Sequence, residues 1–196
     1  MRQSLSPIAS RSAVALLHYP VIDRNGQVVT TSVTNLDIHD IARSVKTFGL
    51  SSYFLVNPAA GQHELVGRLL HHWREGWGAT YNSKRKDALE VVRLVTDLSE
   101  VKESMAQEFG TSPRLVLTGA GQRPGTIGCS ALLAELEHTP DPVIFAFGTG
   151  WGFTKEFFDE ADYVLDPITG SGSYNHLSVR AAAAIYLDRL FGRQQD

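Results

Sequence analysis

Two glycine-rich segments with small polar residues lie close together in the last quarter of the sequence. The apolar run VIFAF (143–147) leads into GTGWGF (148–153), and YVL (163–165) leads into DPITGSGSYNHL (166–177). Glycine lets bare backbone approach a ligand and adopt positive φ. Ligands of parallel α/β proteins bind at the carboxyl ends of the strands, where both segments would lie. The two segments therefore predict a small-molecule pocket.

The glycine spacing also permits a dinucleotide-binding interpretation. A strand precedes Gly148, and Asp166 follows at the end of another strand, as such a loop requires. Phe153 occupies the third glycine position, and too few residues follow Asp166 for the remaining strand-helix units. A nicotinamide-dependent oxidoreductase is therefore kept only as an alternative.

Two further motifs and the single cysteine argue against metal or nucleoside triphosphate chemistry. His63-Glu64 begins a zinc-protease pattern, but Gly67 stands where the second histidine belongs. The segment GAGQRPGTIG (119–128) lacks the lysine of a nucleotide-triphosphate loop. Cys129 alone can form neither an intramolecular disulfide nor a cysteine-based zinc site, and it fits a reducing compartment. We expect no metal.

A short basic run is the clearest candidate for binding a nucleic-acid backbone. Lys84, Arg85 and Lys86 are adjacent, and Arg123 lies in a later glycine-rich segment. The alternative for the run is a solvated charged loop. Because the net charge is −3 and the pI is near 6.2, any nucleic acid must bind to a local patch.

Aromatic residues lie just before this run. Trp77 and Tyr81 could stack on an unpaired base. Trp73 follows the apolar stripe of its helix, which indicates a place in the core instead.

The whole chain reads as one α/β domain. Its 196 residues, 43% of them hydrophobic, can bury one core, and residues 1–12 are expected to be a disordered tail before a domain at 13–196. No apolar run is long enough to cross a bilayer, and we expect a cytoplasmic protein with no membrane partner. Apolar strand-like runs alternate with amphipathic ones, which predicts a mostly parallel sheet flanked by helices. The expected strands are 13–19, 53–56, 89–95, 114–118, 143–147 and 163–165.

The expected helices position the candidate residues between these strands. Asn35 can cap the first helix, and Gly49 can end it. Ser178 caps the last helix, whose alanines imply a close helix contact, which a dimer could supply. The other expected helices are 61–74, 99–109, 128–136 and 154–160. A turn at 24–26 predicts a small hairpin.

FGTGWGF (147–153) and DPITGSGSYNHLSVRAAAAIYLDRL (166–190) resemble the SPOUT class of RNA methyltransferases. More narrowly, the sequence resembles the bacterial family related to a domain that is sometimes fused to tRNA (guanine-N1)-methyltransferase. The resemblance extends over about residues 13–190. It implies a carboxyl-terminal trefoil knot, S-adenosylmethionine as the methyl donor with S-adenosylhomocysteine as product, tRNA or rRNA as substrate, and a homodimer.

The same resemblance supplies three candidate catalytic residues. TNLDIHDIARSVKTFG (34–49) resembles the first motif of the ribose-methylating branch, which places its asparagine at Asn35 and its arginine at Arg43. SGSYNHLSVRAA (171–182) resembles the third motif, which places its serine at Ser173 and its asparagine at Asn175. Arg43, Asn175 and Asn35 are therefore the predicted catalytic residues.

The methyl donor needs apolar walls for its adenine, backbone donors and acceptors, and little competing positive charge. The segments LTGAG, FGTGWG and PITGSGSYNHL meet these needs. The predicted cofactor-binding residues are Leu117, Thr118, Gly119, Ala120, Phe147, Gly148, Thr149, Gly150, Ile168, Gly170, Ser171, Tyr174, Asn175, His176 and Leu177.

The sequence therefore predicts an S-adenosylmethionine-dependent RNA methyltransferase. The main alternative is a non-catalytic knotted module that binds RNA or a partner enzyme. The modified nucleotide, the choice between base and ribose, the group that accepts the proton, and the need for a further RNA-binding partner are left open.

Overall fold

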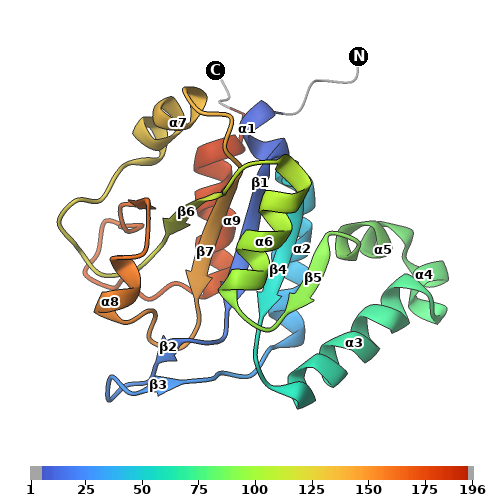
Figure 1. The fold of residues 1–196 in the computed structure, drawn as a ribbon. Helices are drawn as coiled ribbons and strands as arrows, with labels where there is room; N and C mark the ends of the chain where they lie inside the picture. The colour runs from blue at the N-terminus through green and yellow to red at the C-terminus, as the bar shows by residue number, and fades with distance from the viewer. Residues whose placement is uncertain (1–5, 194–196) are drawn as a thin grey trace.

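The protein is built around one parallel sheet of six strands, and the structure, a computed structural model, describes residues 6–193 (Figure 1). The strand order is β5-β4-β1-β7-β6-β8. The strands are β1 (Ser12–Leu17), β4 (Ser52–Val56), β5 (Val92–Val95), β6 (Arg114–Leu117), β7 (Val143–Gly148) and β8 (Tyr163–Val164). This arrangement confirms the predicted mostly parallel α/β fold.

The sheet is assembled from two halves that meet at β1. From β1 the chain runs through β4 to β5 at one edge, and the later strands extend the other side from β7 through β6 to β8. β1 pairs with both halves, and Leu17 lies opposite Val56 of β4 and Gly148 of β7. The carboxyl ends of the central strands therefore meet along one edge.

Helices cover both faces of the sheet (Figure 1). On one face α2 (Asn35–Phe48) and α9 (Val179–Phe191) lie side by side, and α7 (Cys129–Glu137) packs against α9. On the other face, α6 (Leu98–Phe109) and α8 (Lys155–Phe158) cover the opposite side chains of the strands. Two apolar cores follow, because successive strand side chains point to opposite faces.

Three further helices, α3 (Ala60–Arg74), α4 (Trp77–Tyr81) and α5 (Ser83–Leu89), extend beyond the edge strand β5 (Figure 1). The predicted strand 89–95 is therefore too long at its start, because Leu89 ends α5. The basic run 84–86 lies within helix α5 and not in a solvated loop, which was the alternative. Asn82 accepts a hydrogen bond from the backbone N–H of Arg85 and caps α5.

The start of the chain is more ordered than the sequence predicts. Residues 7–10 form the short helix α1 (Pro7–Ser10) instead of belonging to a tail. Ile8 and Ala9 are buried against the core, and Ser6 caps the helix. The part of the predicted tail at 1–5 lies outside the described residues.

Local signals fix the ends of α2 and the small hairpin. Thr34, not Asn35, is the N-cap of α2, and Gly49 ends the helix with φ +78°. The strands β2 (Val21–Ile22) and β3 (Val28–Val29) pair antiparallel around Gly26, as the turn predicts. Within residues 6–193, no helix combines the length and apolar character needed to cross a membrane. The trefoil knot stays a prediction.

Candidate functional site

A cavity of about 600 Å³ opens where β6, β7 and β8 end. Its walls come from four stretches of chain: the segment before α2 with the first turn of that helix, the loop after β6, the glycine loop after β7, and the loop after β8 with the start of α9. The lining residues are Thr31, Ser32, Thr34, Asp37, Thr118, Gly119, Ala120, Phe147, Gly148, Thr149, Gly150, Trp151, Gly152, Ile168, Asn175, His176, Leu177, Ser178, Val179, Ala182 and Tyr186.

The glycine loop is held against the β2-β3 hairpin by backbone contacts. The N–H of Trp151 donates to the carbonyl oxygen of Ile22 at 3.0 Å, and the N–H of Ile22 donates to that of Gly152 at 2.9 Å. Gly150 has φ +60°, and a Cβ placed there would lie 2.9 Å from the Ile22 oxygen. Glycine is therefore required at position 150 by both conformation and space.

Hydroxyl groups form one side of the cavity. The Oγ1 atoms of Thr31 and Thr149 lie 2.5 Å apart, and the Thr149 hydroxyl also donates to the Leu17 carbonyl oxygen at 3.1 Å. Thr118 donates from Oγ1 to the Ala146 carbonyl oxygen at 3.1 Å. These bonds fix the first residue after β6 relative to β7, and the loop after β7 relative to β1.

A buried histidine supports this hydroxyl pair from behind. The Nδ1 atom of His18 lies 2.9 Å from Thr31 Oγ1, and the side chain is fully buried. Burial lowers the pKa of His18 to about 4, although the Asp37 carboxylate acts in the opposite direction. At neutral pH the ring is therefore uncharged and cannot repel a cationic ligand.

Asp37 places a carboxylate in the cavity wall. Thr34 donates from Oγ1 to Oδ2 of Asp37 at 2.6 Å, while the Asp37 backbone N–H donates back to Thr34 Oγ1. Arg180, at the start of α9, lies 3.4 Å from Asp37 Oδ1 and 3.1 Å from Asp40 Oδ2. The same ion pairs join α2 to α9 beside the cavity.

The loop before α9 closes the remaining side. Asn175 donates from Nδ2 to the Ala120 carbonyl oxygen at 2.8 Å. Tyr186 donates from its hydroxyl to the Asp166 carbonyl oxygen at 2.8 Å, and burial raises the pKa of Tyr186 to about 12. Tyr186 therefore stays neutral, with its hydroxyl committed to the backbone of this loop.

These walls fit a sulfonium methyl donor. The volume is within the range of small-molecule sites, roughly 300–1,000 Å³. Phe147, Ile168 and Leu177 give apolar surface, and the loops after β6 and β7 present backbone groups. The lining includes one carboxylate and no lysine or arginine, so a positively charged sulfonium meets no like charge in the wall.

Most of the predicted cofactor residues come together in this cavity. Eleven of the fifteen line it: Thr118, Gly119, Ala120, Phe147, Gly148, Thr149, Gly150, Ile168, Asn175, His176 and Leu177. Leu117 does not, because its side chain is buried in the core under α6 and α8. Gly170, Ser171 and Tyr174 lie on the exposed part of the loop, outside the lining.

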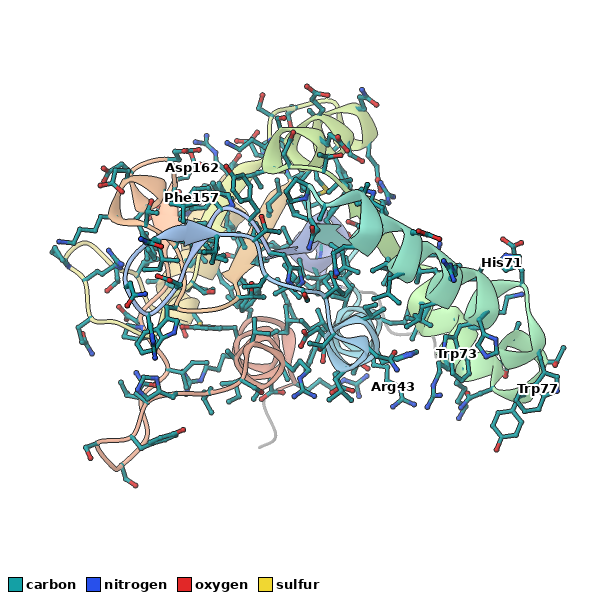
Figure 2. The ribbon with its side chains drawn as sticks, turned by 90° about the horizontal axis from the view of Figure 1, so that it is seen from below. Arg43, His71, Trp73, Trp77, Phe157 and Asp162 are labelled. Carbon is teal, nitrogen blue, oxygen red and sulfur yellow. The ribbon has the colours of Figure 1, made fainter. Side chains whose placement is uncertain are left out.

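Only one of the three predicted catalytic residues lies at the cavity. Asn175 lines the cavity, whereas Asn35 and Arg43 do not. Asn35 is exposed in the first turn of α2, where Thr34 takes the capping role. Figure 2 shows Arg43 on the outer side of α2, because its helical position faces away from the sheet.

The basic residues lie outside the cavity. Lys84 and Lys86 lie on α5, where the Arg85 guanidinium lies 4.4 Å from the Trp73 ring centre. Arg123 stacks on Phe158 at 3.6 Å. The two groups belong to opposite ends of the sheet and form no single patch (Figure 1).

Sequence reasoning missed the other lining residues, which are Thr31, Ser32, Thr34, Asp37, Trp151, Gly152, Ser178, Val179, Ala182 and Tyr186. Thr34 and Asp37 have the spacing of a capping box, which could have placed the Asp37 carboxylate at the amino end of the helix. Trp151, 68% exposed, carries no comparable signal. Among residues 6–193, no three His, Cys, Asp or Glu side chains group as a metal site.

Comparisons with known proteins identify the family of the chain. The sequence pattern of the family described as SAM-dependent RNA methyltransferase matches residues 11–192. The chain is 42% identical over 178 residues to a tRNA (guanine-N(1)-)-methyltransferase of Nitratidesulfovibrio vulgaris. That match includes 91% of this chain but 41% of the relative, so the chain spans less than half of the relative's length.

Solved structures share the fold at low sequence identity. The TrmH/SpoU tRNA modifying enzyme of Aquifex aeolicus is 14% identical, with a TM-score of 0.52 over 92% of this chain and 74% of that one. The SpoU methyltransferase AviRb from Streptomyces viridochromogenes, solved in complex with AdoMet, is 17% identical, with a TM-score of 0.53 over 91% of this chain and 56% of that one.

These matches confirm the SPOUT-class resemblance and overturn the nicotinamide alternative. A pattern that matches nearly the whole chain, together with the cavity at the ends of β6, β7 and β8, settles the family. The chain belongs to the SAM-dependent RNA methyltransferase family.

Proposed function

We propose that this chain transfers the methyl group of S-adenosylmethionine to tRNA or rRNA. The observation that carries the proposal is the cavity at the carboxyl edge of the sheet, in a chain of the SAM-dependent RNA methyltransferase family. The bound donor supplies an electrophilic methyl group on a cationic sulfur. The protein's part is to hold donor and acceptor in line, since alignment supplies much of the barrier reduction in such transfers.

The proposed binding mode follows the lining residues. Ile168 and Leu177 would give apolar surface for the adenine faces, and the Asn175–Leu177 stretch would hold the ring edge. Backbone groups at 118–120 and 148–150 would hold the ribose and the carboxylate of the donor. These assignments use the segments that the sequence predicts, without Leu117, Gly170, Ser171 and Tyr174.

Asp37 is our candidate for the group that accepts the proton of the acceptor nucleotide. It is the carboxylate of the cavity lining, and its pairing with Thr34 and Arg180 fixes its orientation. General-base assistance of this kind typically contributes about 10²–10⁴ in rate. Asn175 keeps its proposed role beside the acceptor.

We also propose a homodimer. Arg43 lies outside the cavity of its own subunit, so a role in the reaction requires it to reach the cavity of a second copy. Within the subunit, the small residues of α9 already allow its close packing on α2. Sedimentation of the unchanged protein and of Arg43→Ala tests whether the chain forms a dimer. Mixed dimers of Arg43→Ala and Asp37→Asn subunits then test whether Arg43 acts in the cavity of the second copy. If it does, mixing the two variants should restore activity.

The proposed cellular setting is the cytoplasm. A single half-buried thiol, Cys129, fits a reducing compartment, and RNA is the substrate class of the family. The proposed trefoil knot would pass the residues before α9 through the loop after β6. The Asn175 to Ala120 hydrogen bond supports the contact between these two segments.

The proposal is tested by incubating the protein with radiolabelled S-adenosylmethionine and total RNA from cells that lack the gene. Label incorporated into one nucleoside supports an enzyme, and mass spectrometry of that nucleoside separates base from ribose methylation. Calorimetric binding of the donor without incorporation would instead favour the non-catalytic module. The guanine-N1 activity in the name of the longer relative belongs to a protein of which this chain matches 41%, so the acceptor atom is left to this experiment.

A further inference from the structure

An exposed aromatic pair lies on the projection formed by α3, α4 and α5. Trp77 and Tyr81, one turn apart on α4, are 68% and 70% exposed. Their rings stack with centres 4.8 Å apart and planes at 20°. Figure 2 shows Trp77 at the far end of this projection from the sheet. Two large rings are thus held in register while most of their surface faces solvent.

The pair is supported by a rigid base. Gly78 is buried, and a Cβ there would lie 2.6 Å from the Trp73 ring, so α4 packs directly onto α3. Asn82 ends α4 and caps α5, which fixes the angle between the two short helices. The rings therefore lie on a preformed surface, which reduces the ordering cost of binding a ligand.

Cations border the pair on α5. Lys84 is exposed, and Arg85 stacks on Trp73 with its Nε buried and without a hydrogen-bond partner among the described residues. Arg85 and Arg43 both act on His39, whose pKa is lowered mainly by burial and further by these two charges. The cations of α5 and α2 therefore share one stretch of surface.

The acidic residues of α3 and its end already have partners. Glu64 pairs with Arg68, and Glu75 pairs with His71 at 3.2 Å. Glu90, at the end of α5, acts on Arg74. Lys84 and Arg85 follow the rings on α5, and the exposed Asp87 lies further along the same helix, beside Lys86.

We infer that Trp77, Tyr81, Lys84 and Arg85 bind unpaired nucleotides of the RNA substrate, at a site separate from the methyl-transfer cavity. Base rings stack on exposed aromatic rings, and neighbouring cations attract the phosphates between the bases. Neither arrangement suits double-stranded RNA, whose bases are already stacked. The inference rests on the proposed function, since it assigns this surface to the same RNA.

The alternative occupant is a protein, including a second copy of this chain. An apolar protein partner would match the rings but gains nothing from Lys84 and Arg85, whereas a polyanion uses both. Charge complementarity therefore favours RNA. If the rings lay in a subunit interface, replacing them would shift the protein to a smaller assembly, which sedimentation measures.

The test compares three variants of the full chain with the unchanged protein, by fluorescence anisotropy with a labelled twelve-nucleotide oligoadenylate. Trp77→Leu/Tyr81→Leu removes both rings, and Trp77→Phe/Tyr81→Phe keeps ring stacking. Leu65→Ala is the matched control, because Leu65 is 54% exposed on α3 outside the patch. The leucine form should bind about 5- to 100-fold more weakly, since stacking contributes about 1–3 kcal/mol per base, while the phenylalanine form and the control stay near the unchanged protein.

Salt dependence gives a second readout. Lys84→Ala should lower the slope of log affinity against log salt by about 0.7, the value for one phosphate contact on a single strand. Calorimetry should show unchanged S-adenosylmethionine affinity for the leucine form. This separates a failure of the inference from a failure of the methyl-donor site.

Three outcomes overturn the inference: equal oligoadenylate affinity of the leucine and phenylalanine forms, an unchanged salt slope, or a shift of the leucine form to a smaller assembly on sedimentation. The last outcome would assign the rings to a subunit interface. Methyl transfer by the unchanged protein would still stand in each case, so the proposed function is judged independently.

Discussion

The side-chain amide of Asn175 donates a hydrogen bond to the carbonyl oxygen of Ala120 at 2.8 Å, joining two residues 55 positions apart in the chain. Ala120 follows β6 and Asn175 precedes α9, so the bond connects opposite walls of the cavity. Neither wall can move away from the other without losing it.

Asn175→Ala should therefore weaken donor binding without unfolding the protein. Loss of one hydrogen bond at a partly exposed position corresponds to about 1 kcal/mol, or a 3- to 10-fold rise in Kd for S-adenosylmethionine. Calorimetric titration measures it. Ser173→Ala, on the exposed part of the same loop, is the control. Equal Kd values for both variants and the unchanged protein would remove Asn175 from the donor site.

Gly150→Ala should be costly because φ is +60° and the new Cβ would meet the Ile22 oxygen. We expect the free energy of unfolding to fall by about 1–3 kcal/mol, with a weaker donor Kd as the glycine loop shifts. Gly170→Ala is the matched control, since no atom lies within 4 Å of its added Cβ, and it should stay within about 0.5 kcal/mol. Urea unfolding of both variants measures this difference. Similar unfolding midpoints for Gly150→Ala and Gly170→Ala would contradict the described loop geometry.

Asp37→Asn removes the carboxylate of the cavity and leaves Arg180 with Asp40 alone. The free energy of unfolding should fall by about 1–3 kcal/mol, less than for a fully buried pair, because the Arg180 side chain is 31% exposed. If Asp37 accepts the proton, kcat should drop by about 100-fold or more.

Asp40→Asn is the control for Asp37, because it pairs with the same arginine at an exposed edge. It should change stability by less than about 1 kcal/mol and leave kcat near that of the unchanged protein. A normal kcat in Asp37→Asn, measured with saturating RNA, would assign the proton to another acceptor.

His18 should make stability depend on pH. The pKa of His18 in the folded protein is about 4, below the ordinary histidine value of 6.5, so the unfolded chain binds the proton more readily. The stabilisation is complete above pH 6.5 and is lost as pH falls toward 4, by at most about 3 kcal/mol. Urea unfolding at several pH values should show this slope. In His18→Asn the slope between pH 6.5 and 4.5 should be shallower; an identical slope would assign it to other groups.

Much of the sheet could be predicted because each central strand is a short, continuous apolar run. VIFAF in β7 and SYFLV in β4 are buried on both faces, and such runs are typical of parallel strands. Gly49 and Ser178 likewise marked a helix end and a helix start by their local chemistry.

The projection was harder to predict, because α4 and α5 are short and carry little apolar periodicity. Ala88 and Leu89 are the buried apolar residues of α5, and they read equally well as the start of the following strand. Tertiary packing against α2 and α3 stabilises α5 as a helix, and the local sequence does not encode this packing.

The predicted residues that line the cavity come mainly from its glycine-rich loops, whereas the lining residues contributed by α2 were not predicted. Gly148 and Gly150 indicate from the sequence alone that the backbone lies close to a neighbouring group. Arg43 and Asp37 lie on the same helix, but which of them faces the cavity depends on the helix's rotation against the sheet. That rotation is set by the buried face of Ile38, Ile41 and Val45.

The walls of the cavity come from residues near 31, 118, 149 and 177, and no continuous fragment contains them all. A partly folded intermediate thus lacks the cavity that binds the donor. The donor therefore binds only the native state. Saturating S-adenosylmethionine should protect the protein against heat and proteases in proportion to the logarithm of its concentration.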